Sequence, residues 1–249
     1  MTQQDIFQTA QEQLAIDLNC STADLISEKD TFIFTEAKNN PGRRSFPRDE
    51  RHFEMATIGH ATVITTTPDI LHIIKPMLDG KSRDEGFAMP FVYYHTLVHL
   101  PDLKALKPIS PPVGFDYEIV ERDNIPALYE IKGFENAIGY DINHPRPDMQ
   151  AWLAKKDGKI VGMAGCSADC ARMWQVGIDV LPDYRNHNLA VYLVTQLTLE
   201  ILSRGYVPYY STSVSNIASQ RVAYRSGYAP VWTCAYKGKF DGFETAPVG

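Results

Sequence analysis

Residues 174–228 decide the fold of this chain, and they read WQVGIDVLPDYRNHNLAVYLVTQLTLEILSRGYVPYYSTSVSNIASQRVAYRSGY. The first part, Trp174 to Val180, is apolar and rich in β-branched side chains, which is typical of a buried strand. Leu181-Pro182 ends that strand, because proline cannot donate a ladder hydrogen bond. The chain is therefore predicted to leave a sheet at this point.

A polar turn at 183–188 and an amphipathic helix follow the strand. Apolar residues recur at every fourth position from Leu189 onwards, and Gly205 provides a left-handed stop. This order places a loop and a helix N-terminus just past a strand end. Free N–H groups and the positive end of the helix dipole attract phosphate there. We therefore predict phosphate binding at this loop, with a solvated, capped turn as the alternative.

A second strand, a shorter helix and a third strand complete the stretch. The strands are predicted at 207–212 and 228–236, and Asn216 is predicted to cap a helix that ends at Gly227. With the first strand and helix, these elements predict a mixed α/β fold.

This stretch resembles the GNAT superfamily of N-acetyltransferases in two motifs. The family carries a loop of the form Gln/Arg-x-x-Gly-x-Gly/Ala, and residues 185–190 of this chain read RNHNLA. Many members also show Asn-x-x-Ser, an aliphatic and a basic residue, and Gly-Phe/Tyr. The matching residues here are Asn216, Ser219, Val222, Arg225, Gly227 and Tyr228. The resemblance extends back to about Phe115 and implies the acyl-CoA N-acyltransferase fold.

The resemblance implies that acetyl-CoA is the cosubstrate. In the family, backbone N–H groups of the loop hold the pyrophosphate, which here would involve Arg185, Asn186, His187, Asn188, Leu189 and Ala190. Backbone groups of Ile178 and Val180 would pair with the pantetheine amides, and Asn216 and Ser219 would line the same arm.

Asn188 stands where the family has glycine. Asparagine is among the few other residues that tolerate a left-handed conformation, so we expect a positive φ at this position.

The implied reaction is transfer of the acetyl group to a primary amine by direct attack in a ternary complex. The backbone near Val180 would stabilise the oxyanion, and the amine needs a base or a water chain to lose its proton. The family's acidic tyrosine falls at Ala223, so Tyr224, one position later, is the candidate acid. Glu135 is the candidate base, beside Asp141 and His144, and the predicted acceptor pocket is lined by Tyr140, Trp152 and Trp174.

Composition limits the other possibilities. The 249 residues carry a formal net charge of −6, which argues against general attraction to nucleic acid. The first twenty residues contain no basic start and no long apolar run, so we expect no signal peptide, no membrane association and a cytoplasmic location. Four cysteines without metal-site spacing predict neither a disulfide framework nor a metal.

Consecutive prolines at Ser110-Pro111-Pro112 predict a domain boundary. Residues 1–112 form an N-terminal α/β region in this interpretation, and residues 113–249 form the acetyltransferase domain. The N-terminal region has three possible roles: a degenerate copy of the same fold, a lid over the acceptor site, or a platform for a homodimer.

Several further elements are predicted from local patterns. They are helices from Ile6 and at Ser21-Thr22, a strand at 31–35, a hairpin at 53–58 and 61–67, a helix opened by Pro68 and closed by Gly80, a strand at 89–100, a strand at 117–120, helices at 123–131 and 134–140, and a hairpin at 150–154 and 159–166.

Three functions remain open at this point. The first is the acetyltransferase, with a small-molecule or protein amine as acceptor. The second is a catalytically silent CoA-binding sensor or scaffold, and the third is an interaction protein that has lost CoA. The acceptor cannot be named, because fold-level resemblance does not carry substrate identity.

Overall fold

A computed structural model describes residues 1–44 and 51–238. The chain divides into two compact units, and each contains separate parts of the sequence. The first unit comprises 1–10, 99–212 and 216–230, and the second comprises 11–98, 213–215 and 231–249. The single boundary expected at residue 112 remains a prediction.

The first unit is built on a mixed sheet with the strand order β5-β10-β9-β8-β7-β6. Strands β6 to β9 are antiparallel neighbours, whereas β9 and β10 are parallel. The bounds are β5 (Thr96–Pro101), which enters this unit at His99, β6 (Asp116–Glu121), β7 (Asp148–Lys156), β8 (Lys159–Ala168), β9 (Met173–Val180) and β10 (Val207–Ser213). The predicted hairpin across Asp157-Gly158 is confirmed, and both turn residues have positive φ.

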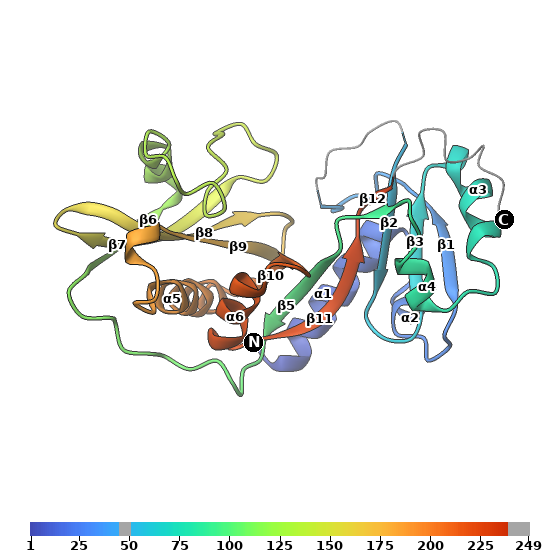
Figure 1. The fold of residues 1–249 in the computed structure, drawn as a ribbon, viewed down its shortest axis with the longest axis horizontal. Helices are drawn as coiled ribbons and strands as arrows, with labels where there is room; N and C mark the ends of the chain where they lie inside the picture. Colours follow the sequence, from blue (N-terminus) through green and yellow to red (C-terminus); the bar gives the residue numbers. More distant parts are fainter. Residues whose placement is uncertain (45–50, 239–249) are drawn as a thin grey trace. The chain divides into compact units, whose positions relative to one another are not determined.

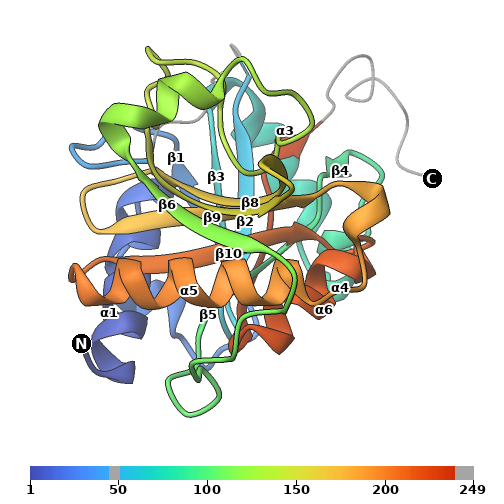
Figure 2. The ribbon, with the colours of Figure 1, turned by 90° about the vertical axis from the view of Figure 1, so that its left-hand side faces the viewer.

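Two helices cover one face of this sheet, α5 (Leu189–Ser203) and α6 (Ile217–Arg225) (Figure 1). Figure 2 shows α5 running along the strands with α6 beside it. Leu193, Leu197 and Ile201 are fully buried against the strands, as their spacing predicted. Asn216 caps α6 by accepting a hydrogen bond from the Ser219 N–H, and Gly227 follows the helix with φ +82°. Both predicted helices are confirmed.

The segment between β6 and β7 covers the opposite face (Figure 1). The expected helix at 123–131 is a 3₁₀ helix, η1 (Arg122–Leu128), because Pro126 has no N–H to donate to an α-helical carbonyl. The expected helix at 134–140 is wrong, since this stretch forms turns without a helix. Its Asn136 and Ala137 N–H groups donate to the carboxylate of Asp179 on β9 at 2.7 and 3.2 Å. The N–H groups of Ala137 and Ile138 also donate to the carbonyl of Phe134 at 3.0 and 3.1 Å, so a single turn forms here and the distant carboxylate holds it.

Two glycines in the sheet let this segment lie directly on the strands. An added Cβ at Gly177 would lie 1.7 Å from the carbonyl oxygen of Asn136, and one at Gly165 would lie 2.0 Å from that of Ala137. Neither position can carry a larger side chain while the backbone stays in place. The glycines therefore fix the height of the loop above β8 and β9.

The second unit contains a smaller mixed sheet with the order β1-β3-β2-β11. Strands β1 and β3 are parallel, and the predicted hairpin of β2 and β3 is confirmed. The strands are β1 (Phe32–Glu36), β2 (Phe53–Thr57), β3 (Thr62–Thr66), β11 (Tyr228–Ala235), which begins in the first unit, and the short pair β4 (Val92–Tyr93) and β12 (Lys237–Gly238). The helices are α1 (Gln3–Leu18), which also begins in the first unit, α2 (Thr22–Leu25), α3 (Pro68–Leu78) and α4 (Arg83–Phe87).

One strand expected in the N-terminal region is interrupted. Residues 89–100 do not form a continuous strand, because Tyr94 has φ +58° and separates β4 from β5. Helix α4 was not expected, although Ser82 and Glu85 form the capping box that signals it. Within 1–44 and 51–238, no helix is long and apolar enough to cross a membrane, and no group of three or more His, Cys, Asp or Glu side chains could hold a metal.

The glycine contact gives a first test of the fold. We expect Gly177→Ala to lower the free energy of unfolding by about 1–3 kcal/mol, because the new methyl group overlaps a backbone carbonyl. Gly59→Ala is the control, since nothing lies within 4 Å of a Cβ at that position. Urea unfolding followed by circular dichroism measures both, and equal midpoints would contradict the packing of the loop on the sheet.

Candidate functional site

The loop after β9 carries the predicted phosphate site. A short 3₁₀ turn, η2 (Pro182–Tyr184), follows the strand, and α5 begins at Leu189. Asn188 is the N-cap residue and has φ +60°, which is the left-handed conformation expected for the family's glycine position. Asn186 also has a positive φ, +68°. Two asparagines thus perform the turn that glycine would otherwise make.

The backbone N–H groups at the start of α5 are available to a ligand. In the described part of the chain, no acceptor pairs with the N–H groups of residues 187 to 191. The Asn188 side chain does not cap the helix, and the first turn contains no acidic residue. Unpaired N–H groups at the positive end of a helix dipole attract anions.

Two arginines contact this loop through side-chain hydrogen bonds. Arg225 on α6 donates from Nη2 to Oδ1 of Asn188 at 2.6 Å, and Arg185 donates from Nε to the carbonyl of Val180 at 3.1 Å. Arg225 was noted in the sequence only as the basic residue of the second motif, and its position 37 residues after Asn188 gives no local sign of this contact. Both guanidinium groups add positive charge beside the free N–H groups.

Strands β9 and β10 stop pairing before either strand ends. The last paired residues are Val176 and Tyr210, although β9 continues to Val180 and β10 to Ser213. On its other edge, β9 stays paired with β8 as far as Val180. Strand β9 therefore loses its hydrogen-bonding partner on the β10 edge only.

The open edge presents the backbone groups that the sequence singled out. The N–H of Leu181 donates to the carbonyl of Val161 at 2.9 Å on β8. Because hydrogen-bonding direction alternates along an antiparallel strand, the N–H and C=O groups of Ile178 and Val180 point away from β8 and towards the gap. Arg185 donates a hydrogen bond to the carbonyl of Val180. The N–H and C=O groups of Ile178 and the N–H of Val180 are left for a ligand.

A cavity of about 540 Å³ adjoins the loop. Phe115 forms part of its wall, and the ring of Phe115 lies edge-on to that of His187 at 6.0 Å. Other lining residues are Ile109, Val113, Tyr192, Asn188 and Arg225. An apolar hollow beside an anion site and an arginine suits a planar, phosphorylated group. The lining residues from the 109–115 linker carry no motif, so only their position in the fold reveals them.

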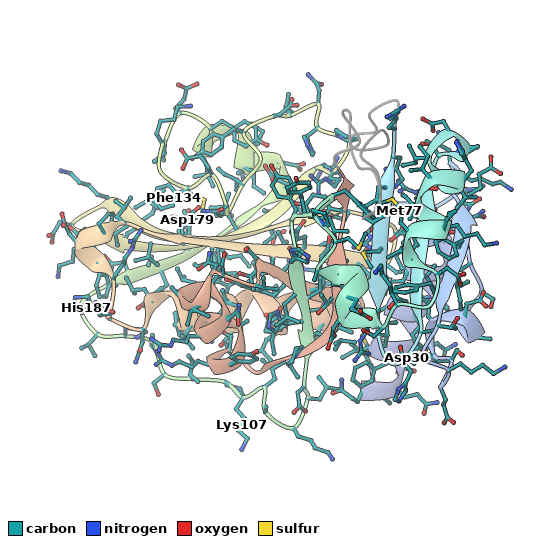
Figure 3. All side chains as sticks on the ribbon, turned by 45° about the vertical axis from the view of Figure 1, so that its right-hand side comes forward. Asp30, Met77, Lys107, Phe134, Asp179 and His187 are labelled. Atoms are coloured by element: carbon teal, nitrogen blue, oxygen red, sulfur yellow. The ribbon has the colours of Figure 1, made fainter. Side chains whose placement is uncertain are left out.

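A second cavity, of about 300 Å³, lies on the loop-covered face of the sheet. Figure 3 shows Phe134 and Asp179 on that side, away from His187. Its lining includes Glu135, His144 and Asp148 from the covering segment and strand β7, and Gln175 and Gly177 from β9.

The two carboxylates of this cavity differ in environment. Asp148 is buried and accepts hydrogen bonds from the Gly139 N–H and the Tyr129 hydroxyl, and burial raises the pKa of its carboxyl group. Glu135 is exposed, and the backbone N–H of Gly133 lowers the pKa of its carboxyl group. A carboxylate with a lowered pKa is a weak proton acceptor, so Glu135 attracts a cation more readily than it removes a proton.

The remaining residues selected from the sequence lie outside both cavities. Trp174 is buried and stacks on Tyr206 at 4.2 Å, and Trp152 packs on the same cluster beneath α5. Alternate strand residues face opposite sides of a sheet, and both tryptophans take the helix face rather than the loop face. Tyr140 donates its hydroxyl to the carbonyl of Ile131, and Tyr224 is 46% exposed with its ring against His99. The structure does not bring these four side chains together.

A helix start with unpaired N–H groups lies beside an opened pair of parallel strands, and this geometry suits an elongated, phosphorylated ligand along a strand edge. Residues 117–228 match the acetyltransferase (GNAT) family. The match covers less than half of the chain, and it shows a GNAT-type domain in that region. Acyl transfer is the general chemistry of that family.

Solved structures of GNAT proteins resemble the chain weakly. A GCN5-related N-acetyltransferase-like protein from Streptococcus suis is 17% identical over 73% of this chain and 72% of its own, with a TM-score of 0.44. A GCN5-related N-acetyltransferase from Kribbella flavida is 18% identical over 64% of this chain and 63% of its own (TM-score 0.44), and a tandem GNAT protein from the clavulanic acid biosynthesis pathway is 12% identical over 65% and 60% (TM-score 0.46). The chain spans less than two thirds of the last two proteins. No curated protein matches it.

The left-handed N-cap gives a second test. Asn188→Gly and Asn188→Val both remove the amide contact with Arg225, so their difference isolates the backbone conformation. We expect the valine variant to be less stable than the glycine variant by about 1–2 kcal/mol, because a β-branched residue resists positive φ. Thermal unfolding measures the difference, and equal melting temperatures would show that residue 188 does not need a positive φ.

Proposed function

We propose that this protein is an N-acetyltransferase that transfers an acetyl group from acetyl-CoA to a primary amine. The observation that carries the proposal is the combination of unpaired N–H groups at residues 187–191 with the open edge of β9 at Ile178 and Val180. Both features lie within one continuous segment, residues 178–191. A ligand with a diphosphate at one end and an extended amide arm can use both.

Each part of the cosubstrate has a candidate partner in the chain. The N–H groups of residues 187–191 would bind the pyrophosphate, and Arg185 and Arg225 would add charge-assisted contacts. The cavity lined by Phe115 and His187 would take the adenosine end. The N–H of Val180 and the carbonyl of Ile178 would pair with the pantetheine amides as an added strand pairs with a sheet edge.

The arm would enter at the loop and run from Val180 towards Val176, so the acyl group supplied by acetyl-CoA would lie near the N–H of Ile178. That N–H points into the gap and would donate to the oxyanion that develops when the amine attacks the carbonyl. The acceptor would enter from the cavity beneath the loop. Glu135 and Asp148 give that cavity negative charge, while Arg146 is paired with Asp169, so a cationic amine is favoured there. A bound ammonium group must lose its proton before attack, because only the neutral amine is nucleophilic.

A silent CoA-binding protein is the second candidate, and one observation favours it. Ala223 occupies the family's tyrosine position and is completely buried, while Tyr224 turns its ring to His99. Without a proton donor at that point, protonation of the departing thiolate would fall to water and turnover would be slower, which favours a protein that mainly binds the cosubstrate. Thiol release from acetyl-CoA in the presence of an amine panel, which includes small amines, amino acids and peptide N-termini, separates the two candidates.

Cosubstrate binding can be tested independently of turnover. We expect titration calorimetry to show micromolar binding of acetyl-CoA and much weaker binding of ATP. Ala190→Asp should weaken acetyl-CoA binding by at least about tenfold, because it places an anion in the first turn of α5 beside the pyrophosphate. The same change should leave stability equal or slightly higher, since an acidic residue suits a helix N-terminus.

Ala190→Asn is the matched control, because it has nearly the same size without the charge. Equal dissociation constants for the two variants would place the diphosphate elsewhere. Absence of acetyl-CoA binding by the unmodified protein would reject both the enzyme and the silent binder.

A further inference from the structure

Tyr210 stands at the point where β9 and β10 separate. It is the last residue of β10 that pairs with β9, opposite Val176. Its ring faces the helices, packs in the cluster that contains Ala223 and Tyr228, and is 2% exposed. A ligand arm that follows the open edge of β9 inward ends beside this residue.

The hydroxyl of Tyr210 is held at the start of α6. Its Oη lies 2.8 Å from Oγ of Ser219 in a hydrogen bond. The N–H of Ser219 is already used by the Asn216 cap, and its side chain is half-buried. The two hydroxyls therefore form a pair in the first turn of the helix that borders the gap.

Tyr210, on β10, packs against the side of α6 where the family has a tyrosine and this chain has Ala223. Ala223 follows Ser219 by four residues, so both residues lie on one face of α6. Ala223 has no atoms beyond Cβ, and the Tyr210 ring shares its buried cluster. Tyr224, in contrast, is 46% exposed, and its ring lies 5.4 Å from that of His99.

The position of Tyr210 is fixed from the other side by a buried histidine. Nδ1 of His99 lies 3.2 Å from the carbonyl oxygen of Tyr210, and because a carbonyl only accepts, Nδ1 carries the proton. The two rings are nearly perpendicular at 6.4 Å. His99 thus holds the backbone of Tyr210 on one edge while β9 holds it on the other.

We propose that Tyr210 is the proton donor to the departing CoA sulfur, and that Ser219 is the positioning residue for its hydroxyl. This inference rests on the proposed acetyltransferase function. The proposed donor lies on β10, where this strand separates from β9, instead of on α6.

The proposed step balances as follows. The amine nitrogen forms the bond to the acetyl carbon, the carbon–sulfur bond breaks, and its electron pair stays on sulfur. The Tyr210 hydroxyl gives its proton to that sulfur to form the free thiol. The amine releases one proton to water, and the Tyr210 phenolate recovers one proton from water. Burial raises the pKa of the Tyr210 hydroxyl, so the phenol is protonated at neutral pH.

Tyr210→Phe tests the proposal, with Tyr228→Phe as the matched control. Tyr228 is 3% exposed in the same cluster, and its hydroxyl is also bonded to a side-chain hydroxyl, that of Thr198 at 2.7 Å. Both variants lose one buried hydroxyl, so their stabilities should fall alike. We expect kcat with the best amine of the panel to fall about a hundredfold in Tyr210→Phe only, because general acid catalysis contributes on that scale.

The readouts separate catalysis from binding and folding. We expect KM and the calorimetric Kd for acetyl-CoA to stay within about threefold in Tyr210→Phe, since the interaction arises only as the sulfur departs. Ser219→Ala should lower kcat by about tenfold and leave Tyr210 in place. Equal kcat values for the Tyr210 and Tyr228 variants would overturn the proton-donor role alone. An unmodified protein that binds acetyl-CoA without releasing thiol would overturn the enzyme and this inference together.

Discussion

The loss of pairing between β9 and β10 after Val176 and Tyr210 is the constraint on which the rest of the site depends. Buried backbone N–H and C=O groups require partners, and a strand that separates from its neighbour leaves a row of them unpaired. Arg185 satisfies one, the carbonyl of Val180. The others are available to an extended ligand at no cost to the sheet, because β8 holds the opposite edge of β9 throughout.

Two different kinds of packing hold β9 in place where its β10 edge is unpaired. On the helix face, α5 buries a continuous apolar stripe against β7, β8 and β9. On the loop face, Gly165 and Gly177 admit backbone carbonyls into contact with the strands, and Asp179 accepts the N–H groups of Asn136 and Ala137. The edge groups are thus preorganised, which lowers the entropy that a ligand loses on binding.

The sequence determines the second half of the chain largely through local signals. Helix periodicity, the Asn216 cap, the Asp157-Gly158 turn and the left-handed Asn188 each need only their neighbours, and each is confirmed. The stretch at 134–140 depends on Asp179, about forty residues away, so its local pattern wrongly favoured a helix. The tryptophans show a second limit. Strand β9 is covered on both faces, so hydrophobicity alone cannot say which side Trp174 takes.

Both departures from the family motifs involve α6. Asn188, in place of glycine, is held by Arg225, and Ala223, in place of tyrosine, shares its cluster with Tyr210, whose hydroxyl meets Ser219. The orientation of this nine-residue helix therefore sets both the phosphate end and the inner end of the gap. Gly227 fixes where the helix stops, since it has positive φ and a Cβ there would lie 2.5 Å from the backbone of Leu106. Gly227 is thus required for the placement of α6. Through that placement it affects the contacts of α6 with Asn188 and Tyr210, although it touches neither residue.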